Sequence, residues 1–183
     1  MDRRAPRKWR HNIGALIVCA FALARPQYAV AQELWRGLDL GATPKSVLKA
    51  FPDASRPLSI TTLADGETDD LVTHALFFGG RLMEVRFFFR DGSLSTVQLM
   101  PASIQAARTA QNLRLAHTLA DDLTARYGSP FTCGDRSYAA VALFECKWLA
   151  KPTVIRLWYM DIAGQAPALR IAFRKVDDAA YDF

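Results

Sequence analysis

The stretch from Ala75 to Met100 contains two turn signals that constrain the fold more than any other feature of the sequence. Gly79-Gly80 and Asp91-Gly92 both tolerate the positive φ angles that tight hairpin turns require, and apolar residues flank each pair. The stretch therefore predicts three antiparallel strands that follow one another as a meander.

The length of the second turn decides which residues face each other. A two-residue turn would place Phe87 opposite Thr96, whereas a three-residue turn would pair Val85 with Val97. We prefer the three-residue turn because it collects the apolar side chains on one face of the sheet. Those side chains are Met83, Val85, Phe87, Phe89, Val97 and Leu99.

The opposite face of the meander mixes charged, polar and apolar side chains. There we expect Phe88 and Leu94 to form a cross-strand pair. They are either scattered surface residues or residues under a loop, or they belong to a patch that binds a partner. The possible partner-binding face comprises Phe77, Arg86, Phe88, Arg90 and Leu94.

Residues 1–31 have the pattern of a secretory signal peptide. A basic segment, Arg3 to Arg10, precedes the apolar run Ile13–Ala24, and Ala29 to Ala31 is a small-x-small cleavage site. We expect cleavage after Ala31 and a secreted, periplasmic protein. The alternative is a permanent N-terminal membrane anchor, although twelve apolar residues are short for a span.

A lipid anchor is not expected. Leu16 to Cys19 resembles a lipobox, but Val18 stands where a small residue is required before the cysteine. Contact with the membrane is therefore expected only during export. The sequence does not indicate an oligomeric state.

The formal net charge of +5 comes from this N-terminal segment. Residues 1–31 hold six of the 23 basic residues and one of the 18 acidic residues, which leaves 17 of each sign in the rest of the chain. The basic excess is thus a targeting feature, and we expect no nucleic-acid partner.

Two cysteines, Cys133 and Cys146, remain after the expected cleavage. An even number in an oxidising compartment predicts one disulfide, and the alternative is a pair of buried free thiols. The bridge would close a loop of about 14 residues and contribute about 3 kcal/mol in the chain-entropy model.

The other expected elements follow from turn and cap residues. Thr43 and Pro44 begin a helix that ends at Pro52, and a second helix runs from Ser103 to Tyr127. Residues 53–71 form an acidic loop without the spacing of a calcium site. Strands are expected at 33–40, with a further possible one at 58–63, and at 139–148, 153–160 and 168–175, and 177–183 is a loose tail.

Parts of the chain repeat. Val85 to Asp91 is echoed by Ile155 to Asp161, and Ala75 to Phe77 by Ala142 to Phe144. We expect one α+β domain at 32–176. It would consist of two tandem helix-plus-meander repeats, at about 34–100 and 103–176, with the helices packed on one face of the antiparallel sheet.

Leu38 to Pro52 opens with Leu-x-Leu-Gly-x-Thr-Pro and ends with Val-x-x-x-Phe-Pro. This segment resembles the opening of small bacterial envelope proteins of the SmpA/OmlA type. The doubled helix-plus-meander order is similar to the repeat architecture of the β-lactamase-inhibitor protein. The resemblance implies this fold, an envelope location and a protein-binding role, as the SmpA/OmlA type are outer-membrane lipoproteins of an assembly machine. It assigns no functional residue.

Catalytic patterns are scarce after residue 31. His74 and His117 are the histidines there, and the chain has no Gly-x-Ser-x-Gly elbow, His-Glu-x-x-His pair or phosphate-binding glycine loop. We expect no catalytic, cofactor-binding or metal-binding residues and no cofactor. The hypothesis is a non-catalytic module that binds an envelope protein. The alternative is a small-ligand binder or hydrolase that uses a pocket between helix and sheet.

Overall fold

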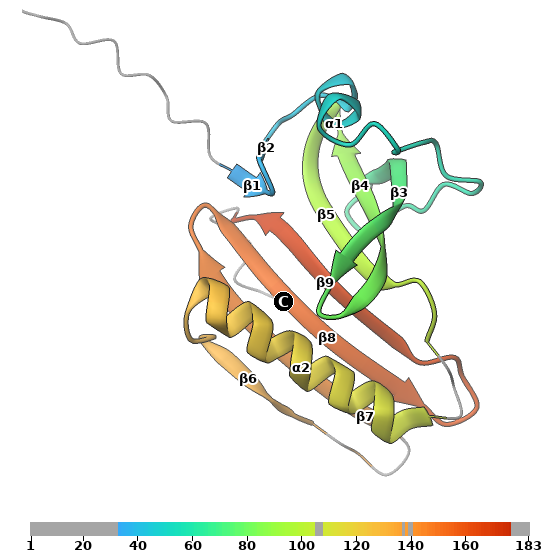
Figure 1. Cartoon of the computed structure of the whole chain (residues 1–183), viewed down its shortest axis with the longest axis vertical. Coiled ribbons are helices and arrows are strands. Elements are labelled where there is room, and N and C mark those ends of the chain that lie inside the picture. Colours follow the sequence, from blue (N-terminus) through green and yellow to red (C-terminus); the bar gives the residue numbers. More distant parts are fainter. Residues whose placement is uncertain (1–32, 105–107, 137, 139–140, 177–183) are drawn as a thin grey trace, which may run out of the picture. The chain divides into compact units, whose positions relative to one another are not determined.

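The computed structural model describes residues 33–104, 108–136, 138 and 141–176. The expected signal segment and C-terminal tail lie outside these residues. In the described part of the chain, two helices and a mostly antiparallel sheet make the fold α+β with predominantly β content (Figure 1). Within the described residues, neither helix has the length and apolar composition to cross a membrane.

Among the described residues, seven antiparallel strands form the main sheet, in the spatial order β3-β4-β5-β9-β8-β7-β6. Their bounds are Thr68–Phe78 (β3), Arg81–Arg90 (β4), Ser93–Pro101 (β5), Thr132–Asp135 (β6), Val141–Ala150 (β7), Thr153–Ile162 (β8) and Ala168–Lys175 (β9). The three-stranded meander predicted from the two turns is confirmed as β3-β4-β5. The expected strand at 33–40 is instead a separate hairpin, β1 (Glu33–Trp35) with β2 (Leu38–Asp39).

The two helices begin differently, α1 at a capping residue and α2 without a side-chain cap. In α1 (Pro44–Ala50), the Thr43 side chain accepts a hydrogen bond from the Ser46 N–H, and Pro44 occupies the first turn, as predicted. The second helix, α2, spans Thr109–Tyr127 and so begins later than the predicted Ser103. Its buried stripe, which includes Leu119 and Leu123, packs against β7 and β8.

The predicted turn length at Asp91-Gly92 is wrong, but the predicted face of the meander is right. Arg90 pairs with Ser93, so the turn has two residues, and a bulge follows because Phe88 pairs with Thr96. The bulge restores the alternation that the longer turn was expected to give. All six predicted apolar residues therefore lie in the hydrophobic core.

The core lies on the face of the sheet that carries the helices. Trp35 of β1 stacks on Phe51 just after α1, with ring centroids 5.5 Å apart, and Phe51 packs on Phe87 of β4 at 5.3 Å. Tyr127 of α2 meets Phe173 of β9 at 6.1 Å. Both halves of the sheet thus contribute to one continuous core.

The predicted disulfide is present between Cys133 and Cys146. The two residues face each other on β6 and β7, so the bridge joins the short edge strand β6 to the sheet. All four residues of β6 are exposed. The disulfide is the covalent link that holds this edge.

Candidate functional site

The loop between α1 and β3 crosses to the outer face of the sheet, the face without helices. Ser55 exchanges two backbone hydrogen bonds with Val72 of β3, at 2.9 and 2.8 Å. Further along, the Asp69 N–H donates to the Thr61 carbonyl at 3.1 Å, and Asp69 Oδ1 accepts from the Thr61 N–H at 2.5 Å. Residues 56–60 therefore form the apex of a loop whose two ends, at Ser55 and Thr61, are hydrogen-bonded to β3.

Arg86 of β4 joins the second of these fixed points to the sheet. Its Nη1 contacts Asp69 Oδ2 at 2.6 Å, and its Nε contacts Glu84 Oε1 at 2.5 Å. The Asp69 side chain is completely buried. Burial lowers the pKa of Arg86, but the hydrogen bonds and charges of Glu84 and Asp69 outweigh it and raise the pKa above its ordinary value.

A second ion-pair cluster fixes the end of the loop. Arg90 Nη2 lies 3.1 Å from both Asp65 Oδ2 and Glu67 Oε1, and Arg174 of β9 bonds to the same two carboxylates, at 3.0 Å for Glu67. Glu67 is buried. The loop is thus held on the outer face by carboxylates that meet arginines of β4 and β9.

The expected partner-binding face does not exist as predicted. Phe88 is completely buried, and Leu94 is buried on the core side, because the bulge reverses the face of Leu94 relative to Thr96. Arg86 and Arg90 bond to the loop rather than pointing freely to solvent. Phe77 is 66% exposed, beside the exposed Leu82 with which it pairs.

Exposed apolar side chains gather instead around residues 56–60. Leu58 is fully exposed, Ile60 is 68% exposed, and Leu48 of α1 is 41% exposed. Leu48 and Ile60 line a hollow of about 460 Å³, with Pro44, Arg56, Pro57, Asp69, Asp70 and Leu71. We call Leu48, Leu58 and Ile60, with this hollow, the α1–loop surface. Sequence reasoning missed it because it placed a possible strand at Leu58–Leu63.

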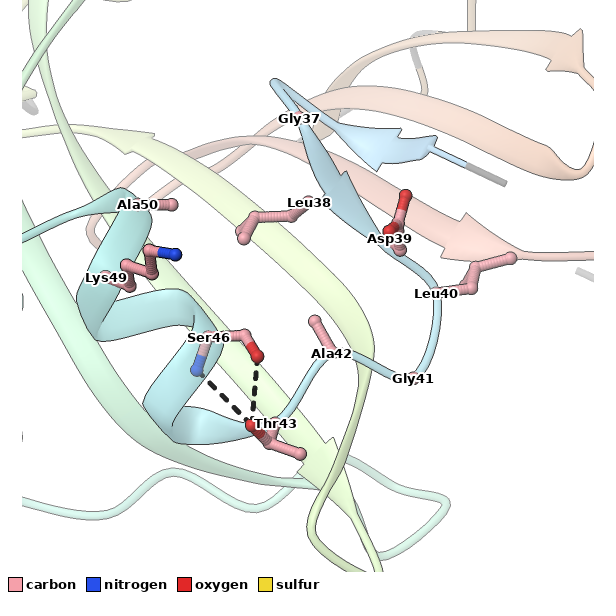
Figure 2. A pocket seen from close by; sticks show the side chains of 10 residues that line it. All are labelled: Gly37, Leu38, Asp39, Leu40, Gly41, Ala42, Thr43, Ser46, Lys49 and Ala50. Carbon is pink, nitrogen blue, oxygen red and sulfur yellow. Dashed lines mark hydrogen bonds between the residues drawn. The ribbon is translucent and has the colours of Figure 1, made fainter. Parts of the chain in front are cut away.

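A larger hollow of about 620 Å³ lies between β2 and α1 (Figure 2). The Thr43 and Ser46 hydroxyl groups bond to each other at 3.1 Å, and Thr43 also caps the helix. The segment that resembles the SmpA/OmlA opening lines this hollow, but Leu38 and Val47 serve the core. The Thr43 and Ser46 hydroxyl groups are used by the cap, and Asp39 and Lys49 are the charged residues of the lining.

The two histidines of the described chain lie on opposite edges of the sheet. His74 of β3 contacts Glu84 at 3.4 Å, and His117 of α2 contacts Asp135 of β6 at 3.6 Å. Since β3 and β6 are the two edge strands, these pairs form no common site. Among the described residues, no group of three His, Cys, Asp or Glu side chains is placed to hold a metal ion.

A partly buried polar cluster around the buried Tyr159 lies on the core side, under the first turn of α2. The Tyr159 hydroxyl donates to Asp161 Oδ2 at 3.1 Å, and the Thr109 hydroxyl donates to the same oxygen at 2.5 Å. Burial, together with the bond and charge of Asp161, raises the pKa of Tyr159 to about 12. The tyrosine therefore stays protonated and serves to attach α2 to β8.

No family model matches the chain, and neither the curated proteins nor the solved structures include a significant match. The fold and the site define the class of protein. It is an α+β protein whose core face carries the helices and whose outer face carries a loop fixed by buried ion pairs, with exposed apolar side chains at its apex.

Proposed function

We propose that this chain is a non-catalytic protein-binding module and that its partner contacts the α1–loop surface. The observation that carries the proposal is the full exposure of Leu58, with Ile60 close to it, on a loop whose two ends are fixed to the sheet. Exposed apolar groups that gather in one place are typical of protein interfaces.

The fixed ends favour binding on energetic grounds. A loop that is already ordered loses less conformational entropy when a partner covers it. Thr61 and Asp69 hold one end by four polar contacts, two of them with Arg86, and Ser55 holds the other end. The hollow between α1 and the loop can accept an apolar side chain of the partner, since Leu48, Pro57 and Ile60 line it.

The proposed setting is the bacterial periplasm, after cleavage following Ala31. The signal pattern of residues 1–31 and the disulfide support this setting, because disulfides persist in oxidising compartments. Mass spectrometry of the exported protein should find Gln32 at the N-terminus. A protein that keeps residues 1–31 would favour the anchored alternative.

The proposal also includes two tandem helix-plus-meander repeats, an order similar to the repeat architecture of the β-lactamase-inhibitor protein. The echoed segments support it: Val85 to Arg90 belongs to β4 and its counterpart to β8, each the middle strand of a meander. The third strands of the two meanders, β5 and β9, pair with each other.

A photo-crosslinking amino acid at position 58 tests the proposed contact. The exposed Phe131, near β6, gives a matched control position. We expect a discrete crosslinked protein species from position 58 in cells that export the chain, and none of that mass from position 131. Identical crosslinks from both positions, or none from position 58, would refute the contact.

The alternative function is that of a small-ligand binder, for which we expected a pocket between helix and sheet. The hollow that favours this alternative lies instead on the outer face of the sheet, over β5, β9 and β8.

A further inference from the structure

A hollow of about 200 Å³ opens on the outer face over β5, β9 and β8. Its floor follows from the cross-strand rows of the sheet. In one row Ala172 stands between Arg156 and Gln98, and in the next Arg174 stands between Val154 and Thr96. Because side chains in a row point to the same face, the small Ala172 leaves a gap between two long neighbours.

The walls of the hollow are rich in hydrogen-bond donors. Arg156 Nε donates to Glu145 at 2.5 Å, and Arg174 uses Nη2 for both Glu67 and Asp65. Each guanidinium has five N–H groups, so most donors of both arginines have no protein partner in the described part of the chain. Arg156 and Arg174 both line the hollow.

Trp158 organises one side of the hollow. The guanidinium carbons of Arg156 and Arg170 lie 5.2 and 5.5 Å from the centre of its ring. Stacking on an aromatic ring limits the rotamers of both arginines and holds their planar donor groups in place. The donors are therefore arranged before any ligand arrives.

The charges around the hollow do not balance. Arg170 forms no ion pair with any other described residue, and Arg90 shares Asp65 and Glu67 with Arg174. Four arginines thus meet three carboxylates. The arginines are Arg90, Arg156, Arg170 and Arg174, and the carboxylates are Asp65, which lines the hollow, Glu67 and Glu145.

The floor holds a polar atom without a partner. Thr96 Oγ1 is buried and makes no hydrogen bond within the described chain, and Thr96 lines the hollow beside Gln98. A buried hydroxyl group of this kind costs free energy unless something bonds to it. The hollow therefore offers a positive rim above a hydroxyl and an amide.

We infer that this hollow binds a small oxyanion, a carboxylate or phosphate group, between Arg156 and Arg174 with Trp158 at its side. Guanidinium groups match the planar geometry of such oxyanions and form charge-assisted hydrogen bonds with them. A neutral ligand would leave the excess positive charge uncompensated. The site shares no lining residue with the hollow of the α1–loop surface.

Titration of the exported chain, which by our proposal begins at Gln32 and so lacks Trp9, tests the inference with sodium phosphate and separately with sodium acetate, at constant ionic strength set by chloride. Trp158 reports binding by its fluorescence, because Trp35 and Trp148 are buried in the core and Trp158 is partly exposed. We expect a saturable change with a dissociation constant near the millimolar range. The anion that saturates identifies the group, and the absence of saturation with both anions would overturn the inference.

Two substitutions locate the binding. Arg156→Gln should weaken the binding by about tenfold or more, since a charge-assisted hydrogen bond is lost. Ala172→Leu should abolish it by filling the gap while leaving every charge in place. Arg126→Gln, at the aromatic Tyr127 on α2, is the matched control and should bind as the unaltered chain does. Calorimetry measures the affinity of each variant for the anion. Equal affinity in Ala172→Leu and the unaltered chain would overturn the inference, and this outcome does not depend on whether Arg156→Gln folds.

Discussion

At the scale of single residues, Phe88 and Phe77 differ in burial, and we expect Phe88 to contribute to folding. It is completely buried, whereas Phe77 on the neighbouring strand is 66% exposed. We predict that Phe88→Ser lowers the free energy of unfolding by about 3–5 kcal/mol. Phe77→Ser should change it by no more than about 0.5 kcal/mol. Urea denaturation measures both. Equal losses in the two variants would mean that the Phe88 side chain is not buried.

The identity of the core residues could be predicted from the sequence, but the outer face could not. Alternation assigned Val85, Phe87 and Val97 to the core, and the assignment holds because the observed two-residue turn with its one-residue bulge keeps Val97 on the same face as the predicted three-residue turn would. The position of Leu94 depended on a one-residue bulge at Ser95, whose hydroxyl donates to the Phe88 carbonyl at 3.2 Å. No residue pattern signals that bulge.

Tyr159 makes the free energy of unfolding depend on pH in the alkaline range. Its pKa is raised from 10 to about 12, so between these values the folded protein keeps a proton that the unfolded chain releases. This contribution to stability is fully present below pH 10 and is lost as the pH rises toward 12. The loss reaches about 2–3 kcal/mol.

Denaturation of the unaltered chain and Tyr159→Phe at pH 9 and pH 11.5 isolates this contribution from that of other groups. We expect a smaller loss of stability between the two pH values in Tyr159→Phe. Parallel losses in both proteins would contradict the role of the Tyr159–Asp161 hydrogen bond.

At the scale of elements, strand β6 depends on its covalent link. It is a four-residue edge strand, fully exposed, and Cys133 joins it to Cys146 of β7. Replacing both cysteines with serine should reduce the free energy of unfolding by about 3 kcal/mol. Hydrogen exchange should then increase at residues 132–135 while β8 and β9 stay protected. Unchanged exchange in β6 would show that the strand is held by its hydrogen bonds alone.

The helices and strands differ in how well local sequence predicts them. Pro44 and Pro52 bracket α1, so its bounds follow from backbone chemistry. The start of α2 does not, since the Arg108 side chain at its N-cap makes no capping hydrogen bond and the helix is fixed by contact with β7 and β8. The course of residues 53–67 was also beyond prediction, because it depends on arginines of β4 and β9.

For the whole molecule, the sheet joins two meanders through β5 and β9, and each face has a separate task. The core face is closed by α1, α2 and β1, and Gly79 of the β3–β4 turn approaches Leu119 of α2 so closely that a Cβ atom there would lie 2.3 Å from its Cδ2. The outer face carries the fixed loop and the proposed oxyanion site, and the α1–loop surface lies where this loop meets α1 beside the edge strand β3. A rigid core with a fixed loop that exposes apolar side chains suits the proposed binding module.

The most direct measurement is the affinity of the crosslinked partner for Leu58→Ser/Ile60→Ser compared with Phe131→Ser. Burying each aliphatic side chain contributes about 1.5–3 kcal/mol, so the double variant should bind at least about a hundredfold more weakly. All three residues are exposed, so the fold should be unaffected, and Phe131→Ser should bind normally. Equal affinity in the double variant and the unaltered chain would contradict the proposed function.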